Sequence, residues 1–195
     1  MQVSKLIMQL RKKADSSNWH LREEAGFTLR NLMEDNFDEV YPLVKDWCYD
    51  PSENVRRAAC LSCMQRKGKS NEVRIKKVLK YLDIIMKDDS LYVRKCCGPF
   101  VVGYLGYTYP SITIPWLKRK ASLKDVNVRT NVAKAFSQGL GRNHFQDGIE
   151  ILEILATDER SRVKSAVISS ARNIIKLNPK ATLMKNTLAL LDSKR

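Results

Sequence analysis

Histidine, glycine-rich motifs and long apolar runs are scarce in this chain of 195 residues. The two histidines, His20 and His144, stand 124 positions apart, which argues against a histidine-based catalytic triad or metal centre. No GxGxxG or GxxxxGK run occurs, so we expect no nucleotide cofactor. The N-terminal stretch, residues 1–13, contains Lys5 and no long apolar run. We therefore predict an amphipathic helix there, and neither a signal peptide nor a membrane span.

Strand-like alternation and breaks in composition are also lacking. Hydrophobic residues make up 44% of the chain, enough for a sizeable core. The five cysteines form an odd number, and the Cys60-x-x-Cys63 pair has no second CxxC at zinc-finger distance. We expect buried, reduced thiols in a cytoplasmic monomer that holds no metal or cofactor. A single all-α domain over residues 1–195 follows from these features.

A short pattern recurs five times along the chain. An aliphatic residue precedes a basic one, and small or apolar residues stand three and seven positions after the basic residue, as on one face of a helix. The five pairs are Leu21-Arg22, Val55-Arg56, Val93-Arg94, Val128-Arg129 and Val163-Lys164. The steps between the basic residues are 34, 38, 35 and 35, which predicts a helical-repeat solenoid of about five helix pairs.

The predicted helices follow the apolar spacing. They cover residues 3–13, 19–33, 53–66, 71–86, 88–106, 116–123, 127–140, 148–156 and 160–177. A further helix begins at Asp38 with Pro42 in its first turn, and residues 107–115 are predicted to form a loop, with a small hairpin as the alternative. Gly68, Gly139 and Gly141 are expected to end helices. A last helix carrying Leu183, Leu188 and Leu191 would cap the stack.

Charge is distributed unevenly along the sequence. Residues 1–65 carry nine basic and ten acidic residues, whereas residues 66–195 carry 26 basic and 11 acidic residues, a net charge of +15. Two basic runs stand out, at residues 66–80 and at residues 118–124. Such an excess predicts a polyanionic partner for the later repeats.

The aliphatic-Arg pair after an Asp resembles the signature of HEAT repeats. That resemblance implies a structural role for the arginine, which in such repeats ties to the Asp of a neighbouring unit. We expect this role for Arg22 and Arg129. Arg129 also remains a candidate for contact with nucleic acid.

The middle of the chain, about Trp47 to Pro110, resembles the HEAT-like DNA alkylation-repair glycosylases of the AlkD and AlkC type. The resemblance rests on Trp47, on Arg56-Arg57 and on the run of residues 93–98, VRKCCG. Gly98 is its best discriminator, because a glycine in mid-helix costs ~1 kcal/mol relative to alanine and needs a close-packing reason.

The resemblance implies a basic groove that holds duplex DNA by its backbone. It further implies that Asp50 stabilises a cationic sugar and that Trp47 faces an N3- or N7-alkylated purine. The alternative roles are a core residue for Trp47 and a helix cap for Asp50. The predicted nucleic-acid contacts are Arg56, Arg57, Arg94, Lys95, Lys118, Arg119, Lys120 and Arg129.

Two functions are therefore expected from the sequence. The first is DNA binding, with glycosylase activity as a further hypothesis. The second is a non-catalytic scaffold that binds an acidic protein.

Overall fold

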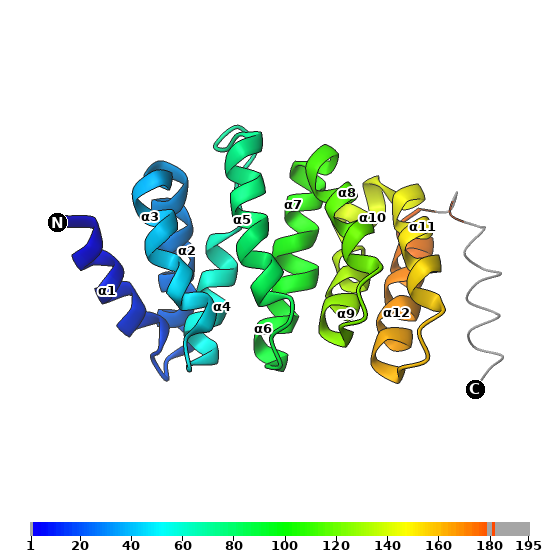
Figure 1. Cartoon of the computed structure of the whole chain (residues 1–195), viewed down its shortest axis with the longest axis horizontal. Coiled ribbons are helices and arrows are strands. Elements are labelled where there is room, and N and C mark those ends of the chain that lie inside the picture. Colours follow the sequence, from blue (N-terminus) through cyan, green and yellow to red (C-terminus); the bar gives the residue numbers. More distant parts are fainter. Residues whose placement is uncertain (1, 179–180, 182–195) are drawn as a thin grey trace. The chain divides into compact units, whose positions relative to one another are not determined.

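Helices account for all the regular structure in residues 2–178 and 181, the part of the chain that the computed structural model describes (Figure 1). No strand occurs in this part, which confirms the prediction of an all-α protein. The helices group into two compact units, Met1–Cys97 and Gly98–Arg195, which are described separately below.

The first unit is built on contacts between the helices that carry the repeat signature. Its elements are α1 (Gln2–Ala14), α2 (Trp19–Asp35), α3 (Phe37–Val44), the 3-10 helix η1 (Lys45–Tyr49), α4 (Glu53–Ser62), α5 (Glu72–Ile85) and α6 (Leu91–Cys96). Helix α2 packs on α4, and α4 packs on α6, while α1, α3, η1 and α5 pack beside them.

The second unit repeats this manner of packing. Its elements are the π-helical turn η2 (Cys97–Val102), whose first residue still belongs to the first unit, α7 (Gly103–Thr108), α8 (Pro110–Ala121), α9 (Val126–Ala135), α10 (Gly139–Asn143), α11 (Phe145–Ala156) and α12 (Ser161–Leu177). Helix α9 packs on α7, α8 and α12, and α12 also packs on α11. The predicted final helix with Leu183, Leu188 and Leu191 lies outside the described residues.

Helix starts follow the capping residues of the sequence. The side chain of Asn18 accepts from the His20 amide, and that of Asn71 accepts from the Arg74 amide. The side chains of Ser90 and Asp125 do the same for α6 and α9. These oxygens satisfy amides that have no partner within the first helical turn.

The secondary structure around the prolines differs from the predicted one. Residues 107–115 are not a loop, because α7 runs to Thr108 and α8 begins at Pro110, a position where a missing amide costs nothing. Pro115 and Pro42 both lie inside helices. The buried faces around them, such as Ile114 and Leu117 in α8, compensate for the lost hydrogen bond.

Two other boundaries differ from the predicted ones. The helix expected over residues 127–140 ends at Ala135, and Gly139 begins α10 instead of ending a helix. The Ser137 hydroxyl donates to the Lys134 carbonyl at 2.7 Å, a local bond that competes with continuation of the helix. Gly68 does adopt the left-handed conformation, with φ of 80°, but in the turn beyond α4.

The signature residues form the core as predicted. Val55 and Ala59 in α4 and Cys63 directly after it are fully buried. The equivalent residues of α6 with η2, of α9 with the residue after it, and of α12 are at most 1% exposed. Leu21 in α2 is the exception, at 37% exposure. The apolar spacing therefore identified the buried face of each signature helix.

Candidate nucleic-acid interface

The signature arginines bind the loops that precede their own helices. Arg22 donates from Nη1 to the carbonyls of Ser16 (2.9 Å) and Ser17 (2.8 Å). Arg56 donates in the same way to the residues five and six positions before it, and so does Arg94. These bonds satisfy carbonyl groups of the loop, which the backbone amides of the helix do not reach.

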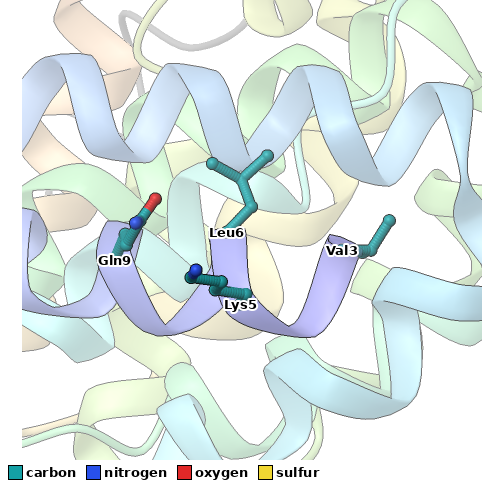
Figure 2. Close-up of a pocket in the computed structure, with 4 residues that line it drawn as sticks. All are labelled: Val3, Lys5, Leu6 and Gln9. Carbon is teal, nitrogen blue, oxygen red and sulfur yellow. The ribbon is translucent and has the colours of Figure 1, made fainter. Parts of the chain in front are cut away.

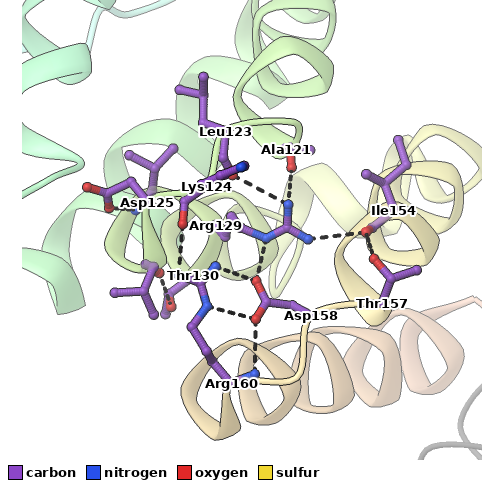
Figure 3. Close-up of polar contacts among 12 residues, drawn as sticks. Ala121, Leu123, Lys124, Asp125, Arg129, Thr130, Ile154, Thr157, Asp158 and Arg160 are labelled. Atoms are coloured by element: carbon purple, nitrogen blue, oxygen red, sulfur yellow. Dashed lines mark hydrogen bonds and ion pairs between the residues drawn. The ribbon is translucent and has the colours of Figure 1, made fainter.

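Two of the signature arginines also bind an aspartate about 30 residues further along the chain. Arg129 Nε lies 2.6 Å from Asp158 Oδ2, and Arg56 Nε lies 2.5 Å from Asp88 Oδ2. Arg129 further donates to the Ile154 carbonyl, and Figure 3 shows its guanidinium enclosed by these partners. The predicted structural role is confirmed for Arg129, whereas Arg22 binds loop carbonyls and the Tyr92 hydroxyl.

The predicted nucleic-acid contacts of the first unit are thus mostly engaged within the protein. Besides Arg56 and Arg94, Arg57 pairs with Glu23 and lies over the Tyr92 ring, 4.7 Å from its centroid. Lys95, by contrast, is exposed, and no carboxylate of the described residues pairs with it.

The basic run on α8 likewise contains both side chains that are engaged within the protein and one that is exposed. Lys118 Nζ lies 2.7 Å from Glu150 Oε2 and 3.6 Å from Asp147 Oδ1, both on α11. Lys120 lies over the Trp116 ring, 5.7 Å from its centroid. Arg119 is exposed. Of the three predicted contacts, Arg119 is therefore the one that projects into solvent with no ion pair in the described chain.

The residues that the resemblance assigns to catalysis are both buried. Trp47 is 4% exposed and Asp50 is 8% exposed. The Asp50 carboxylate accepts from Arg11 Nε at 2.8 Å and from the Ser52 amide at 2.9 Å. This geometry favours the alternative roles, a core residue and a cap on the loop before α4, since both groups are enclosed by protein.

Replacing Asp50 by Asn is accordingly expected to lower the free energy of unfolding by about 1 kcal/mol, because a charge-assisted bond to Arg11 is lost whose arginine is 44% exposed and therefore screened by water. Urea denaturation followed by circular dichroism measures this change. Asp46→Asn, at an exposed site a few residues earlier, should leave the stability unchanged. Unaltered stability in the Asp50 variant would contradict the structural role.

Part of the basic excess that follows residue 65 is paired with acids of residues 1–65 in the fold. Arg66 binds the buried carboxylate of Glu34, with Nε 2.6 Å from Oε2, and Lys77 pairs with Asp38. Acids of residues 1–65 thus compensate the basic run that follows them. Counted by structural unit, residues 1–97 carry 19 basic and 14 acidic residues (+5), and residues 98–195 carry 16 and 7 (+9).

One cation of the second unit differs from the others. Lys134 on α9 is only partly exposed, and its Nζ donates to the Ser169 hydroxyl on α12 at 3.1 Å. Burial lowers the pKa of this ammonium, and no carboxylate of the described residues compensates it. Lys134 was not predicted from the sequence, where it is an isolated lysine outside the two basic runs.

A row of aromatic side chains that was not predicted from the sequence is at least partly exposed. Phe100 on η2 and Tyr107 on α7 are each 54% exposed, and Tyr104 between them is partly exposed. The spacing of four and three residues places them along one side of the helical segment. The signal was present in the sequence, but the same spacing is typical of a buried core.

The remaining candidate sites are the cysteines, possible metal ligands and a surface depression. The five cysteines are buried and unpaired, as predicted, and burial raises the pKa of the Cys48 thiol to about 12. Within residues 2–178 and 181, no group of three or more His, Cys, Asp or Glu side chains is placed to hold a metal ion. The depression in Figure 2 lies on α1, and its described lining residues are Val3, Lys5, Leu6 and Gln9, of which Lys5 is ionisable.

None of the helices in the described ranges has both the length and the apolar composition needed to cross a bilayer. No family model matches the chain, and no curated protein matches it. Among solved structures, an engineered protein is similar, with 14% sequence identity over 95% of this chain and 90% of that one and a TM-score of 0.40.

Proposed function

We propose that the chain is a non-catalytic helical-repeat protein of HEAT-like architecture that binds nucleic acid through its second unit. The observation that carries this proposal is the partly buried Lys134, whose ammonium has a hydroxyl partner and no carboxylate partner among the described residues. A cation that loses hydration without gaining a counter-charge lowers the stability of a fold. A bound phosphate would supply the missing charge.

Further cations of the second unit support a polyanionic ligand. They are not paired with any carboxylate in the described part of the chain, and most are exposed: Arg119, Lys124, Arg142, Lys164 and Lys176. The net charge of +9 over residues 98–195 would attract a phosphate backbone over a longer range. The paired arginines of both units instead stabilise the scaffold.

Glycosylase activity is not part of this proposal. Asp50 would have to leave Arg11 and the Ser52 amide before it could face a substrate. Trp47 is enclosed in the core, so it offers no open ring face to a cationic base. Release of alkylated base from methylated DNA by the intact chain would restore that hypothesis.

Titration of a fluorescein-labelled DNA with the full chain, at several salt concentrations, tests the proposal. Log K should fall steeply with log salt, by about 0.9 per phosphate contact on duplex. Lys134→Gln should weaken binding roughly tenfold and reduce the slope by about one unit. The stability of this variant should be equal to or higher than that of the wild type, because an uncompensated cation is removed.

Lys118→Gln is the matched control, since it removes the same charge from a lysine that already pairs with Glu150 and Asp147. It should change DNA affinity much less than Lys134→Gln. Equal losses in the two variants would mean that only net charge matters. Binding of polyglutamate as tight as that of DNA would instead favour the acidic-protein scaffold.

A further inference from the structure

The aromatic row on η2 and α7 is formed by Phe100, Tyr104 and Tyr107, of which Phe100 and Tyr107 are each 54% exposed and Tyr104 is partly exposed. None of the ring–ring or cation–ring contacts in the described chain involves these three side chains. In the first unit, by contrast, Tyr41 and Tyr81 stack with their centroids 4.3 Å apart. Exposed aromatic side chains clustered in this way are typical of a contact surface.

Close helix packing brings η2 and α7, which carry this row, against α9, which carries Lys134. A Cβ built on Gly98 would lie 2.7 Å from the Asn131 carbonyl oxygen, and one on Gly103 would lie 2.8 Å from the Ala135 carbonyl oxygen. The backbones of η2, α7 and α9 are therefore in direct contact. Tyr104 follows Gly103 in sequence and Lys134 precedes Ala135, so each stands one residue from this helix–helix contact, and the Lys134 Nζ donates to Ser169 on α12.

We propose that the aromatic row stacks the bases of an unpaired strand while Lys134 and its neighbours bind the phosphates, so that the second unit prefers single-stranded nucleic acid to duplex. This inference rests on the proposed function. Aromatic faces beside cations are the combination that holds single strands without sequence preference. In a duplex the base faces are already stacked on one another, which leaves only edges and phosphates for contact.

Charge complementarity decides between this ligand and an apolar protein segment. The second unit carries a net charge of +9, and the helices that bear the row pack on the helix that bears Lys134. A strand of nucleotides supplies an anion and a ring face in each residue. An apolar helix would cover the rings but leave Lys134 uncompensated.

The test uses three labelled probes of equal length: single-stranded oligo-dT, the same strand in duplex, and an abasic strand with the same phosphates. Anisotropy titrations with the full chain at two salt concentrations give the affinities. Oligo-dT should bind at least roughly tenfold more tightly than either of the other probes, because each stacked base adds a substantial contribution.

Leucine substitutions at the aromatic row separate stacking from apolar contact, since leucine retains bulk and removes the ring face. Tyr104→Leu or Tyr107→Leu should each weaken oligo-dT binding roughly tenfold and leave binding of the abasic strand unchanged. Tyr49→Leu, at a 65% exposed site in the first unit, is the matched control and should change neither affinity. Circular dichroism confirms that each variant is folded.

The outcomes distinguish the inference from the proposed function. Salt-dependent binding of duplex and abasic strand as tight as that of oligo-dT would overturn base stacking while leaving nucleic-acid binding in place. Undetectable binding of all three probes, even at low salt, would overturn both. Unchanged affinity for oligo-dT in the leucine variants would assign the row to another partner.

Discussion

Replacing Asp158 by Asn is expected to lower the free energy of unfolding by about 3 kcal/mol. Asp158 is buried, and its carboxylate accepts from Arg160 Nε at 2.8 Å while Arg129 Nε lies 2.6 Å away (Figure 3). The variant would leave the enclosed Arg129 guanidinium without its counter-charge. This loss in the free energy of unfolding is at the lower end for a buried ion pair, because the Arg160 side chain is 44% exposed and water screens its charge.

The Asp158 carboxylate should also make the free energy of unfolding depend on pH in the acidic range. Hydrogen bonds from Arg160, with the charge of Arg129 added, hold the pKa of Asp158 well below its ordinary value. A carboxyl whose pKa is lowered on folding stabilises the fold above its unfolded pKa of about 4, and this contribution is lost as pH falls towards the folded pKa. Part of the loss of stability below about pH 4 should therefore be absent in Asp158→Asn.

Urea denaturation at pH 7 and pH 3 measures both effects. Glu159→Gln is the matched control, because it removes one negative charge at the adjacent, exposed position. Its stability should stay within about 0.5 kcal/mol of the wild type at either pH. Equal effects of the two substitutions would show that the Arg129–Asp158–Arg160 cluster contributes no specific stability.

Replacing Gly98 by Ala is expected to destabilise the protein by about 2 kcal/mol, although alanine has the higher helix propensity. The added Cβ would meet the carbonyl oxygen of Asn131 at 2.7 Å and its Cα at 3.1 Å. These are backbone atoms of α9, which cannot turn aside as a side chain would. The Gly98 amide also donates to Asn131 Oδ1 at 3.1 Å, and a shift of the helices would break this bond.

Gly139→Ala provides the comparison for Gly98. A Cβ at Gly139 would meet only the Tyr107 ring, at 3.9 Å, which is ordinary contact. Its stability should equal or slightly exceed that of the wild type, because alanine restricts the unfolded chain. Thermal unfolding followed at 222 nm compares the two variants, and equal midpoints would refute the close-packing explanation for Gly98.

Gly98 also illustrates what local sequence can predict. A glycine inside a helical pattern implied a close approach of backbones, and the structure confirms that approach to α9. The periodicity likewise identified Val128, Val132 and Phe136 as core residues of α9 and its C-terminal end. Both predictions succeed because helix geometry repeats every 3.6 residues and depends only on neighbours in the chain.

Helix boundaries near proline depended on tertiary packing. The sequence predicted a loop over residues 107–115 because Pro110 and Pro115 follow each other closely. The structure has α8 there, and the burial of Trp116 and Leu117 outweighs the lost hydrogen bond. Local propensity does not include that burial, which other helices of the unit provide.

The choice of ionic partners, and with it the candidate surface, was decided by the tertiary structure. The sequence shows only how many basic residues there are. In the fold Arg66 pairs with Glu34, whereas Lys134 has the Ser169 hydroxyl and no carboxylate of the described residues as a partner. Phe100 and Tyr107 have the spacing of core residues and are nevertheless exposed. Residues about 30 positions apart are brought together by helix packing, so composition and periodicity determine which helices form but not which charges and rings remain open to a ligand.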